Sequence, residues 1–120
     1  MITRTRAEFY QSPRWKSVRA SALRRDGYMD MVKHRYGKRI EAELVHHVFP
    51  LDEFPEYGLK LWNLVSVSRG THNQLHDRDT GELTEAGADL LRRVAKKYNV
   101  EIPEKYRETR KESIPPRSRR

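Results

Sequence analysis

Four of the five histidines in this 120-residue chain lie between His46 and His76. They form two groups, the adjacent pair His46-His47 and the pair His72 and His76 in the run His-Asn-Gln-Leu-His, with Asn63 between the groups. Histidine can act as a neutral ligand, a proton acceptor or a cation near neutral pH. This concentration indicates a chemical site, and it requires a fold that brings distant imidazoles together.

Length and composition favour one small domain with a modest core. Hydrophobic residues make up 36% of the chain and charged residues 35%, which predicts a small core and flexible ends. The absence of cysteine excludes disulfides and cysteine-bound zinc, and it fits a reducing cytoplasm. No run of about 18 apolar residues and no apolar N-terminal centre is present. We therefore expect a soluble protein with no membrane span and no secretory signal.

The charge is unevenly distributed along the chain. Of the net charge of +8, residues 1–40 contribute 11 Lys/Arg against 3 Asp/Glu, residues 41–103 contribute 7 against 11, and residues 104–120 contribute 7 against 3. Basic ends suit a polyanion held from both flanks, because phosphate neutralisation supplies affinity that does not depend on sequence. Basic ends would equally keep a small protein soluble, so charge alone leaves both interpretations open.

A basic amphipathic helix is predicted over residues 13–25. Ser12 can cap its first turn, Pro13 suits the first helical position, and Asp26-Gly27 supplies an end. One face carries the apolar residues Trp15, Val18, Ala22 and Leu23, and we expect Phe9 and Tyr10 to pack back on this helix. The other face carries Arg14, Lys16, Arg19, Arg24 and Arg25, and it is either DNA-facing or solvated. We favour Arg14, Lys16 and Arg19 as DNA contacts.

The histidine region predicts a hairpin followed by a helix. Residues 28–38 read as a loop or short turn, with His34 at the surface, and residues 40–49 read as a strand that Pro50 ends. Residues 51–61 predict a compact loop closed by its own aromatic side chains. Residues 63–67 are the candidate partner strand, and Ser68 can cap a helix over residues 69–76. His72 and His76 would then lie one turn apart on one helix face.

A last helix is predicted from Leu83-Thr84 to Tyr98. Its apolar side carries Leu90, Leu91, Val94, Ala95 and Tyr98, and its other side carries Arg92, Arg93, Lys96 and Lys97. Residues 104–120 are basic and contain little to bury, so we expect a flexible tail that could become ordered on nucleic acid.

Three neutral imidazoles, one from the strand and two from the helix, suit a catalytic metal site that keeps positions for water and substrate. The second histidine of the pair could act as a general base toward water. Neighbours in a regular strand point to opposite faces. The pair can therefore serve one site only if the strand distorts near Pro50, or if the scissile phosphate bridges ligand and base.

Together, His46-His47, Asn63, His72 and His76 resemble the motif of the HNH endonuclease family. The surrounding runs, residues 45–50, 62–65 and 72–76, are especially similar to the small HNH nucleases of bacteriophages and prophages, and the similarity covers about residues 9 to 95. The resemblance implies that His46 is the first metal ligand, His47 the general base, and Asn63 the residue that braces the loop and helps hold the base. It implies that His72 and His76 are the second and third ligands.

Two departures from the family pattern affect the expected metal and the stability. Many relatives carry a zinc ion bound by paired cysteines, so hydrophobic packing must replace that ion here. His46 stands where the family often has aspartate, which makes the ligand set neutral. Because imidazole suits transition metals, one divalent ion is expected, with Zn, Ni, Co or Mn favoured somewhat over Mg.

The resemblance implies a metal-dependent DNA endonuclease of the α+β class, with a ββα-metal (His-Me finger) core at about residues 40–77. A single nuclease domain would span residues 1–103, with the basic helix before the core and the last helix after it. Small phage members often work beside the terminase large subunit in genome packaging. A phage origin, a terminase partner and the cytoplasm of a bacterial host are therefore the expected setting.

Two other interpretations remain open at this level. The three histidines could hold a structural zinc in a non-catalytic DNA-binding module, in which His47 would be dispensable. An RNA-binding basic protein would explain the charge but leave the histidine spacing to chance. Arg69, at the start of the predicted short helix, is either a phosphate contact or a surface residue. No base-reading helix with a recognisable code is evident, so we expect weak sequence preference.

Overall fold

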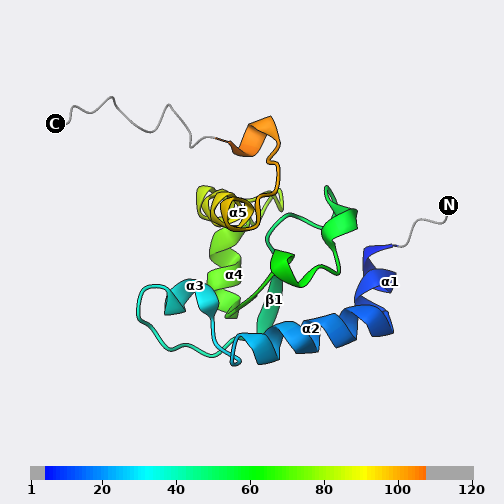
Figure 1. The fold of residues 1–120 in the computed structure, drawn as a ribbon, viewed down its shortest axis with the longest axis vertical. Helices are drawn as coiled ribbons and strands as arrows, with labels where there is room; N and C mark the ends of the chain where they lie inside the picture. The colour runs from blue at the N-terminus through cyan, green and yellow to red at the C-terminus, as the bar shows by residue number, and fades with distance from the viewer. Residues whose placement is uncertain (1–4, 108–120) are drawn as a thin grey trace. The chain divides into compact units, whose positions relative to one another are not determined.

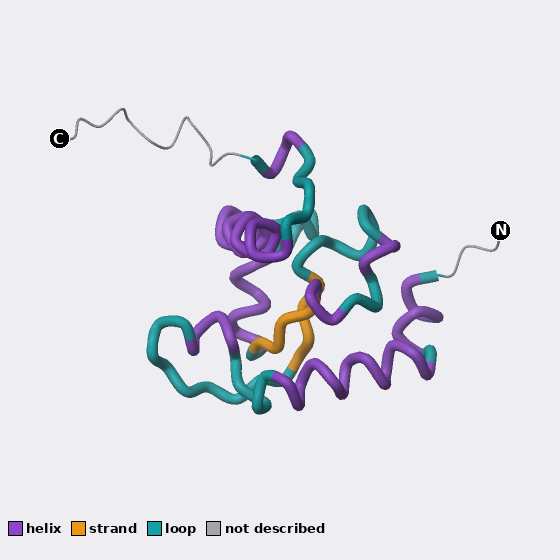
Figure 2. Tube along the Cα trace, viewed as in Figure 1, coloured by secondary structure: helices purple, strands orange, loops and turns teal. Residues whose placement is uncertain are grey.

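The structure is a computed structural model that describes residues 5–107. Its backbone forms two compact units, Met1–His72 and Asn73–Arg120, and the division falls inside helix α4 (Arg69–Leu75). Figure 2 shows that helices and loops make up most of the described chain and that the two strands are short. Within this part of the chain, no helix has the length and apolar composition needed to cross a membrane.

The first unit begins with two consecutive helices, α1 (Arg6–Gln11) and α2 (Pro13–Arg25). The bounds of α2 confirm the predicted helix, and the Ser12 hydroxyl accepts the Trp15 amide at 3.2 Å as the expected cap. The sequence analysis did not predict α1 as a helix, although Thr5 and Glu8 form a reciprocal capping box at its start. Figure 1 shows α2 running along the lower edge of the view, with α1 at its right end and β1 beside it.

The core of this unit lies between α2 and the hairpin. Trp15, Ala22 and Leu64 form its buried centre. Partly buried side chains surround that centre, namely Phe9, Tyr10, Val18, Val45 and Leu59. The predicted inward face of α2 and the predicted packing of Phe9 and Tyr10 on this helix are therefore confirmed.

The last turn of α2 is bonded to the start of the second strand. The Arg25 guanidinium donates to the carbonyl oxygens of Leu61 at 2.7 Å and Leu64 at 2.5 Å. The neighbouring Asp26 carboxylate accepts the Ser66 amide at 3.0 Å. Arg25 is exposed, as expected of the basic face, but its guanidinium also joins α2 to the start of β2, a role that the sequence analysis did not predict.

Strands β1 (Leu44–His47) and β2 (Leu64–Val67) form an antiparallel pair. Leu44 lies opposite Val67, and His47 lies opposite Leu64. The predicted hairpin is confirmed, but β1 is shorter than the predicted strand over residues 40–49. Residues before it pair with the earlier loop instead, since the Ala42 amide donates to the Tyr28 carbonyl at 2.9 Å.

The predicted loop over residues 28–38 contains a short helix, α3 (Met31–His34), which corrects the sequence analysis. Asp30 caps it, and the Asp30 side chain is fully buried. One carboxylate oxygen accepts the Lys33 amide and the other accepts the Ser68 amide, each at 2.9 Å. This one side chain therefore fixes both α3 and the entry to α4. His34 is exposed, as predicted.

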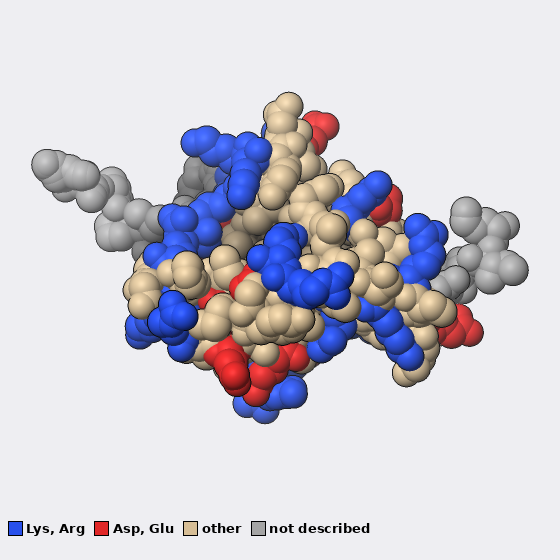
Figure 3. Space-filling model, turned by 60° about the horizontal axis from the view of Figure 1, so that its bottom comes forward, with Lys and Arg blue, Asp and Glu red and all other residues tan. Residues whose placement is uncertain are grey.

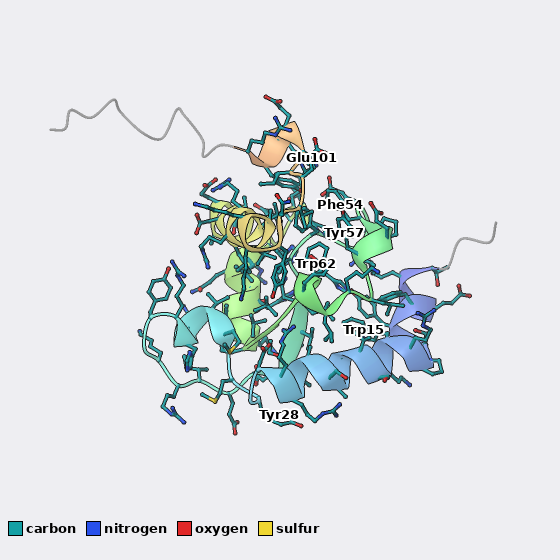
Figure 4. The ribbon with its side chains drawn as sticks, viewed as in Figure 1. Trp15, Tyr28, Phe54, Tyr57, Trp62 and Glu101 are labelled. Carbon is teal, nitrogen blue, oxygen red and sulfur yellow. The ribbon has the colours of Figure 1, made fainter. Side chains whose placement is uncertain are left out.

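The connection between the strands is a compact loop built on aromatic side chains, as predicted. Phe49 is fully buried, and its ring makes edge contacts with Phe54, Tyr57 and Trp62 at centroid distances of 5.1 to 5.8 Å. Figure 4 shows Phe54, Tyr57 and Trp62 gathered in this loop, apart from Trp15 on α2. The loop contains two short 3₁₀ helices, Pro55–Tyr57 and Leu61–Asn63.

The second unit is built on α5 (Glu85–Tyr98). Thr84 caps its start, and Asn99, in the left-handed region at φ 58°, ends it. Leu90, Leu91 and Ala95 are buried as predicted. Tyr98 is 45% exposed, so its predicted place on the inward face is wrong. It lies in the last turn of the helix, one residue before the chain turns away.

A 3₁₀ helix, Glu104–Tyr106, follows α5 at the start of the predicted tail. The Tyr106 carbonyl accepts the Arg92 guanidinium of α5 at 3.0 Å. Residues 108–120, which make up the rest of the predicted tail, lie outside the described residues.

Candidate metal and catalytic site

His46 and His72 come together within the first unit. His46 lies in β1 and is 1% exposed, and its ring meets the His72 ring edge-on with centroids 5.5 Å apart. His72 projects from α4, whose first turn is held by Ser68: the Ser68 hydroxyl accepts the Thr71 amide at 3.2 Å. The hairpin and the helix thus each supply one imidazole, as a ββα arrangement requires.

His76 directly follows the last residue of α4 and lies four residues after His72 in the sequence. Its Nδ1 lies 3.1 Å from the Gly81 carbonyl oxygen. A carbonyl can only accept, so Nδ1 carries the proton and Nε2 holds the lone pair that a metal would need.

His46, His72 and His76 meet the geometric requirement for a metal site. One ring nitrogen from each lies within 4.8 Å of the others. Three neutral imidazoles are a donor set that fits a divalent transition metal, and they leave coordination positions for water or substrate. The residues that the sequence analysis selected as ligands are therefore the ones that the structure brings together.

His47 has a different environment from His46. Its ring stacks on the Trp15 indole, with centroids 5.0 Å apart and planes 26° from parallel. Its Nε2 lies 2.9 Å from the Gly58 carbonyl oxygen, and its Nδ1 lies 3.5 Å from the Tyr10 hydroxyl. Because the Gly58 carbonyl must accept, Nε2 carries the proton and Nδ1 holds the basic lone pair.

Burial favours the neutral form of this imidazole. His47 is 7% exposed, and loss of hydration lowers its pKa from the ordinary value, with a smaller contribution from the nearby Arg6 guanidinium. The hydrogen bond to Gly58 acts in the opposite direction but does not outweigh burial. A neutral imidazole with a fixed tautomer is the form that a general base requires.

The histidine pair lies in a regular part of β1. His46 pairs with Val65 and His47 pairs with Leu64 in an uninterrupted ladder. The two rings accordingly have different neighbours, His72 for His46 and Trp15 for His47. The ladder is regular at the pair, and the backbone bends only after it, at Val48 and Phe49 before Pro50. This bend leaves the two histidines pointing to opposite faces of the strand. A single site then depends on a phosphate that bridges the two imidazoles.

Asn63 braces the loop between the strands, and its side chain is fully buried. Its amide oxygen accepts the Phe49 amide at 2.7 Å, and its amide nitrogen donates to the carbonyls of Phe49 at 3.2 Å and Tyr57 at 3.3 Å. Tyr57 precedes Gly58, whose carbonyl binds His47. Asn63 thus reaches the histidine through the loop backbone and not by direct contact.

The candidate DNA contacts are distributed over two elements. Arg14 and Lys16 on α2 are exposed, Arg19 is partly buried, and Arg69 at the start of α4 is exposed. The Arg69 backbone amide donates to the Glu43 carboxylate at 2.8 Å. This bond fixes the backbone of Arg69 and does not involve its guanidinium. Figure 3 shows Lys and Arg side chains in several separate groups on the face that it presents.

Sequence reasoning missed several residues around the site. Tyr10, Trp15 and Gly58 surround His47, and Asp30 holds the entry to α4. Tyr10 and Trp15 were predicted only as core residues of the N-terminal helix. No local pattern marks Gly58 or Asp30 for these roles, because their partners are distant in the sequence.

The comparisons with known proteins agree with this geometry. No protein-family model matches the chain, and no curated protein matches it. The chain is similar to the crystal structure of an HNH endonuclease, with a manganese ion, from the deep-sea thermophilic bacteriophage GVE2. The sequences are 31% identical, the match covers 54% of this chain and 71% of that one, and the TM-score is 0.54.

The fold and the histidine cluster define a ββα-metal protein of the α+β class, as the sequence predicted. At this identity and coverage, the chain belongs to the HNH endonuclease family. The similarity supports metal-dependent nuclease activity, and the histidine cluster can hold one divalent metal ion.

Proposed function

We propose that this protein is a DNA endonuclease that hydrolyses phosphodiester bonds with one divalent metal ion and a histidine general base. The observation that carries the proposal is the convergence of His46, His72 and His76 within 4.8 Å, with His47 next to His46 in strand β1. The relative from bacteriophage GVE2 is itself an HNH endonuclease with a manganese ion, which supports both the activity and the metal dependence.

In the proposed mechanism, His47 takes the proton from the attacking water. Nε2 remains bonded to the Gly58 carbonyl, so the proton goes to Nδ1. The water oxygen forms a bond to phosphorus, and the bond from phosphorus to one ester oxygen breaks. The Trp15 ring beneath the imidazole can stabilise the positive charge that develops on it, since an aromatic face attracts a cation.

The proposed ligands are His46, His72 and His76. When bound there, a divalent ion would screen negative charge on the phosphate and stabilise the leaving oxygen. The Gly81 carbonyl orients His76 by accepting from Nδ1, so the ligand nitrogen is fixed before any metal arrives. Asn63 is a positioning residue, because it holds the loop backbone that carries Gly58.

The remaining parts of the proposal concern organisation and setting. A single nuclease domain would span residues 1–103, with its core at about residues 40–77, and residues 104–120 would form a flexible basic tail. Arg14, Lys16, Arg19 and Arg69 would contact the DNA backbone. The similarity to a phage enzyme supports a phage origin, and from that origin a host cytoplasm and a packaging role beside the terminase large subunit would follow.

The test uses supercoiled plasmid incubated with the purified chain and a panel of Mn²⁺, Zn²⁺, Ni²⁺, Co²⁺ and Mg²⁺. We expect nicking or linearisation that needs metal and that falls at least about a hundredfold in His47→Ala, consistent with the usual size of general-base effects. Metal affinity should survive that substitution. Tyr98→Ala is the control, because Tyr98 is an exposed ring on α5, outside the histidine cluster. A His47→Ala protein that cuts at the parental rate would overturn the mechanism.

One observation favours a second candidate, a non-catalytic DNA-binding module with a structural zinc. His47 is 7% exposed, and its two nitrogens already face Gly58 and Tyr10, as in a histidine that only stabilises a fold. Under that candidate, zinc removal would unfold the protein, and DNA would be bound but never cut with any metal of the panel. The same plasmid assay, paired with thermal unfolding in chelator, separates the two functions.

A further inference from the structure

The segment between α2 and β1 has no part in the proposed mechanism. We name residues 28–41 the basic loop. Between residues 31 and 40 it carries four basic residues and no acidic one, and every residue from 34 to 40 is exposed. Its basic side chains are Lys33, Arg35, Lys38 and Arg39. Tyr36 lies among them and, at 68%, is the most exposed large hydrophobic side chain in the described part of the chain.

The base of the basic loop is closed by backbone hydrogen bonds. The Asp30 amide donates to the Ile40 carbonyl at 2.7 Å, and the Ala42 amide donates to the Tyr28 carbonyl at 2.9 Å. Met29 and Glu41 form a β-bridge between these bonds. The two ends are therefore joined as a short ladder, and the loop projects from a fixed base (Figure 1).

The tip of the basic loop is equally defined. The Lys38 amide donates to the Lys33 carbonyl at 3.1 Å, and the Gly37 amide donates to the His34 carbonyl at 2.9 Å. This pair of bonds, with Gly37 at φ 81°, is the Schellman ending of a helix, which needs a left-handed residue at that position. Tyr36 immediately precedes Gly37, so its exposure belongs to an ordered turn.

The basic loop is also tied to the helix that carries His72. Asp30 accepts the Ser68 amide at 2.9 Å, and the Ser68 hydroxyl caps α4. The neighbouring residue, Arg69, is exposed. Figure 1 shows α3 beside the beginning of α4, within the first unit. The loop is therefore fixed to the first turn of the helix that carries His72.

An exposed tyrosine among arginines and lysines is suited to unpaired nucleotides. Every base has a flat aromatic face, but in a continuous duplex those faces are covered by neighbouring bases. Stacking of a base on an aromatic side chain contributes about 1–3 kcal/mol, and flanking cations bind the phosphates. The loop offers both features on a fixed backbone.

We propose that the basic loop binds DNA that exposes unpaired bases, with Tyr36 stacked on a base and Arg35, Lys38 and Arg39 on the adjoining phosphates. That the nucleic acid is DNA rests on the proposed function, whereas base stacking is inferred from the exposed Tyr36 and the basic side chains around it. The protein should accordingly bind gapped or branched DNA more tightly than continuous duplex of the same length and sequence.

Fluorescence anisotropy of the full chain, with chelator present to prevent cutting, measures both affinities. In Tyr36→Ala, we expect gapped DNA to bind about 5- to 150-fold more weakly, from the free energy of one stacked base, and duplex to bind within about twofold of the parent. Tyr36→Trp should retain the preference. Tyr98→Ala is the matched control, because Tyr98 is also exposed, at 45%, but lies on α5.

Charge is tested by changing Arg35, Lys38 and Arg39 together to alanine. Loss of three phosphate contacts should weaken both DNAs and lower the slope of log affinity against log salt by about 2 to 3. Lys96→Ala with Lys97→Ala, on the exposed side of α5, is the control for charge lost elsewhere. Thermal unfolding of each variant checks that the fold is retained.

The outcomes separate this proposal from the nuclease assignment. A Tyr36→Ala protein that binds gapped DNA as well as Tyr98→Ala does, or a parent that binds both DNAs equally, overturns the loop proposal. A parent protein that prefers gapped DNA through Tyr36, but that fails to cut plasmid with any metal of the panel, overturns the nuclease assignment and supports the loop proposal. Tighter binding to single-stranded RNA of the same sequence overturns the choice of DNA.

Discussion

The imidazole of His47 lies against the indole of Trp15, with ring centroids 5.0 Å apart. Trp15 comes from α2 and is 5% exposed, so a core residue of the N-terminal helix packs directly against the proposed base. The metal ligand next in sequence, His46, contacts His72 instead. The two functions of the histidine pair can therefore be perturbed separately.

Trp15→Leu should reduce cleavage while leaving metal binding intact. Loss of the flat ring frees His47 to rotate, and we expect kcat to fall about tenfold or more with metal affinity within about twofold, because a small misplacement of a catalytic group has a large cost. Trp15→Phe keeps an aromatic surface, so its kcat should lie between those of the parent and of Trp15→Leu. Kinetics on a labelled duplex and calorimetric metal titration provide the measurements. Equal kcat for the leucine variant and the parent would contradict this role of Trp15.

The three proposed ligands should each be needed for metal binding. We expect His46→Ala, His72→Ala and His76→Ala to weaken Mn²⁺ and Zn²⁺ at least about tenfold by isothermal titration calorimetry, and His34→Ala to have no effect. In the parent, metal at 100 times its Kd should raise the free energy of unfolding by about 2.7 kcal/mol. In His76→Ala at the same metal concentration, a Kd at least about tenfold weaker should reduce that rise to about 1.4 kcal/mol or less. Full metal stabilisation of that variant would remove His76 from the site.

Asn63→Ala should destabilise the first unit. The substitution leaves the buried Phe49 amide and the Tyr57 carbonyl without the partner that Asn63 supplies, and each such group costs about 1–3 kcal/mol. We expect a loss of about 2–4 kcal/mol in urea unfolding. Asn73→Ala, at an exposed position of α4, should change stability by less than about 0.5 kcal/mol. Similar values for the two variants would show that the loop does not depend on Asn63.

Asp30 should make stability depend on acid pH. Burial on its own would raise its pKa, but hydrogen bonds from the Thr71 and Ser68 side chains and from the Lys33 and Ser68 amides outweigh burial and lower it. A carboxyl with a lowered folded pKa stabilises the fold above the unfolded value of about 3.9, and this contribution is lost as pH falls through the folded pKa. We expect Asp30→Asn to be less stable than the parent near pH 7, with a difference that shrinks below about pH 4. Urea unfolding of both proteins from pH 7 to pH 2 measures it, and a constant difference would contradict the assignment.

Two helical glycines should respond oppositely to alanine. A Cβ at Gly87 of α5 would lie 2.4 Å from the Leu75 carbonyl oxygen, whereas a Cβ at Gly70 of α4 would meet no atom within 4 Å. Gly70→Ala should therefore gain up to about 1 kcal/mol from helix propensity. Gly87→Ala should instead lose about 1–3 kcal/mol, because backbone has to shift. Thermal unfolding measures both, and a stabilised Gly87→Ala would show that the close approach is not maintained.

Local signals predicted the elements that carry the site. Ser12 and Pro13 marked the start of α2, alternating apolar residues marked the hairpin, and Ser68 marked the start of α4. These signals act within one turn of helix or between adjacent residues, so one sequence is enough to detect them. The spacing of the four clustered histidines then placed three of them close together without any knowledge of tertiary contacts.

Contacts between distant residues could not be predicted in the same way. Asp30 and Ser68 are 38 residues apart, and Arg25 and Leu64 are 39 apart. An aspartate in a basic loop and an arginine on a basic helix face both have a simpler local explanation as solvated groups. The opposite surroundings of His46 and His47 depend likewise on which elements pack on each face of the hairpin, which the strand pattern alone does not specify.

The ending of α2 changes how the positive charge of this protein should be counted. Arg25 is occupied by two backbone oxygens and by the Asp26 carboxylate, and Arg92 of α5 is occupied by Glu85 and the Tyr106 carbonyl. Either guanidinium would have to give up these bonds to turn toward a polyanion. The count of 25 Lys and Arg residues therefore overstates the number of cations that a nucleic acid meets. Substitution of either arginine should therefore affect the cooperativity of unfolding more than it affects the affinity for nucleic acid.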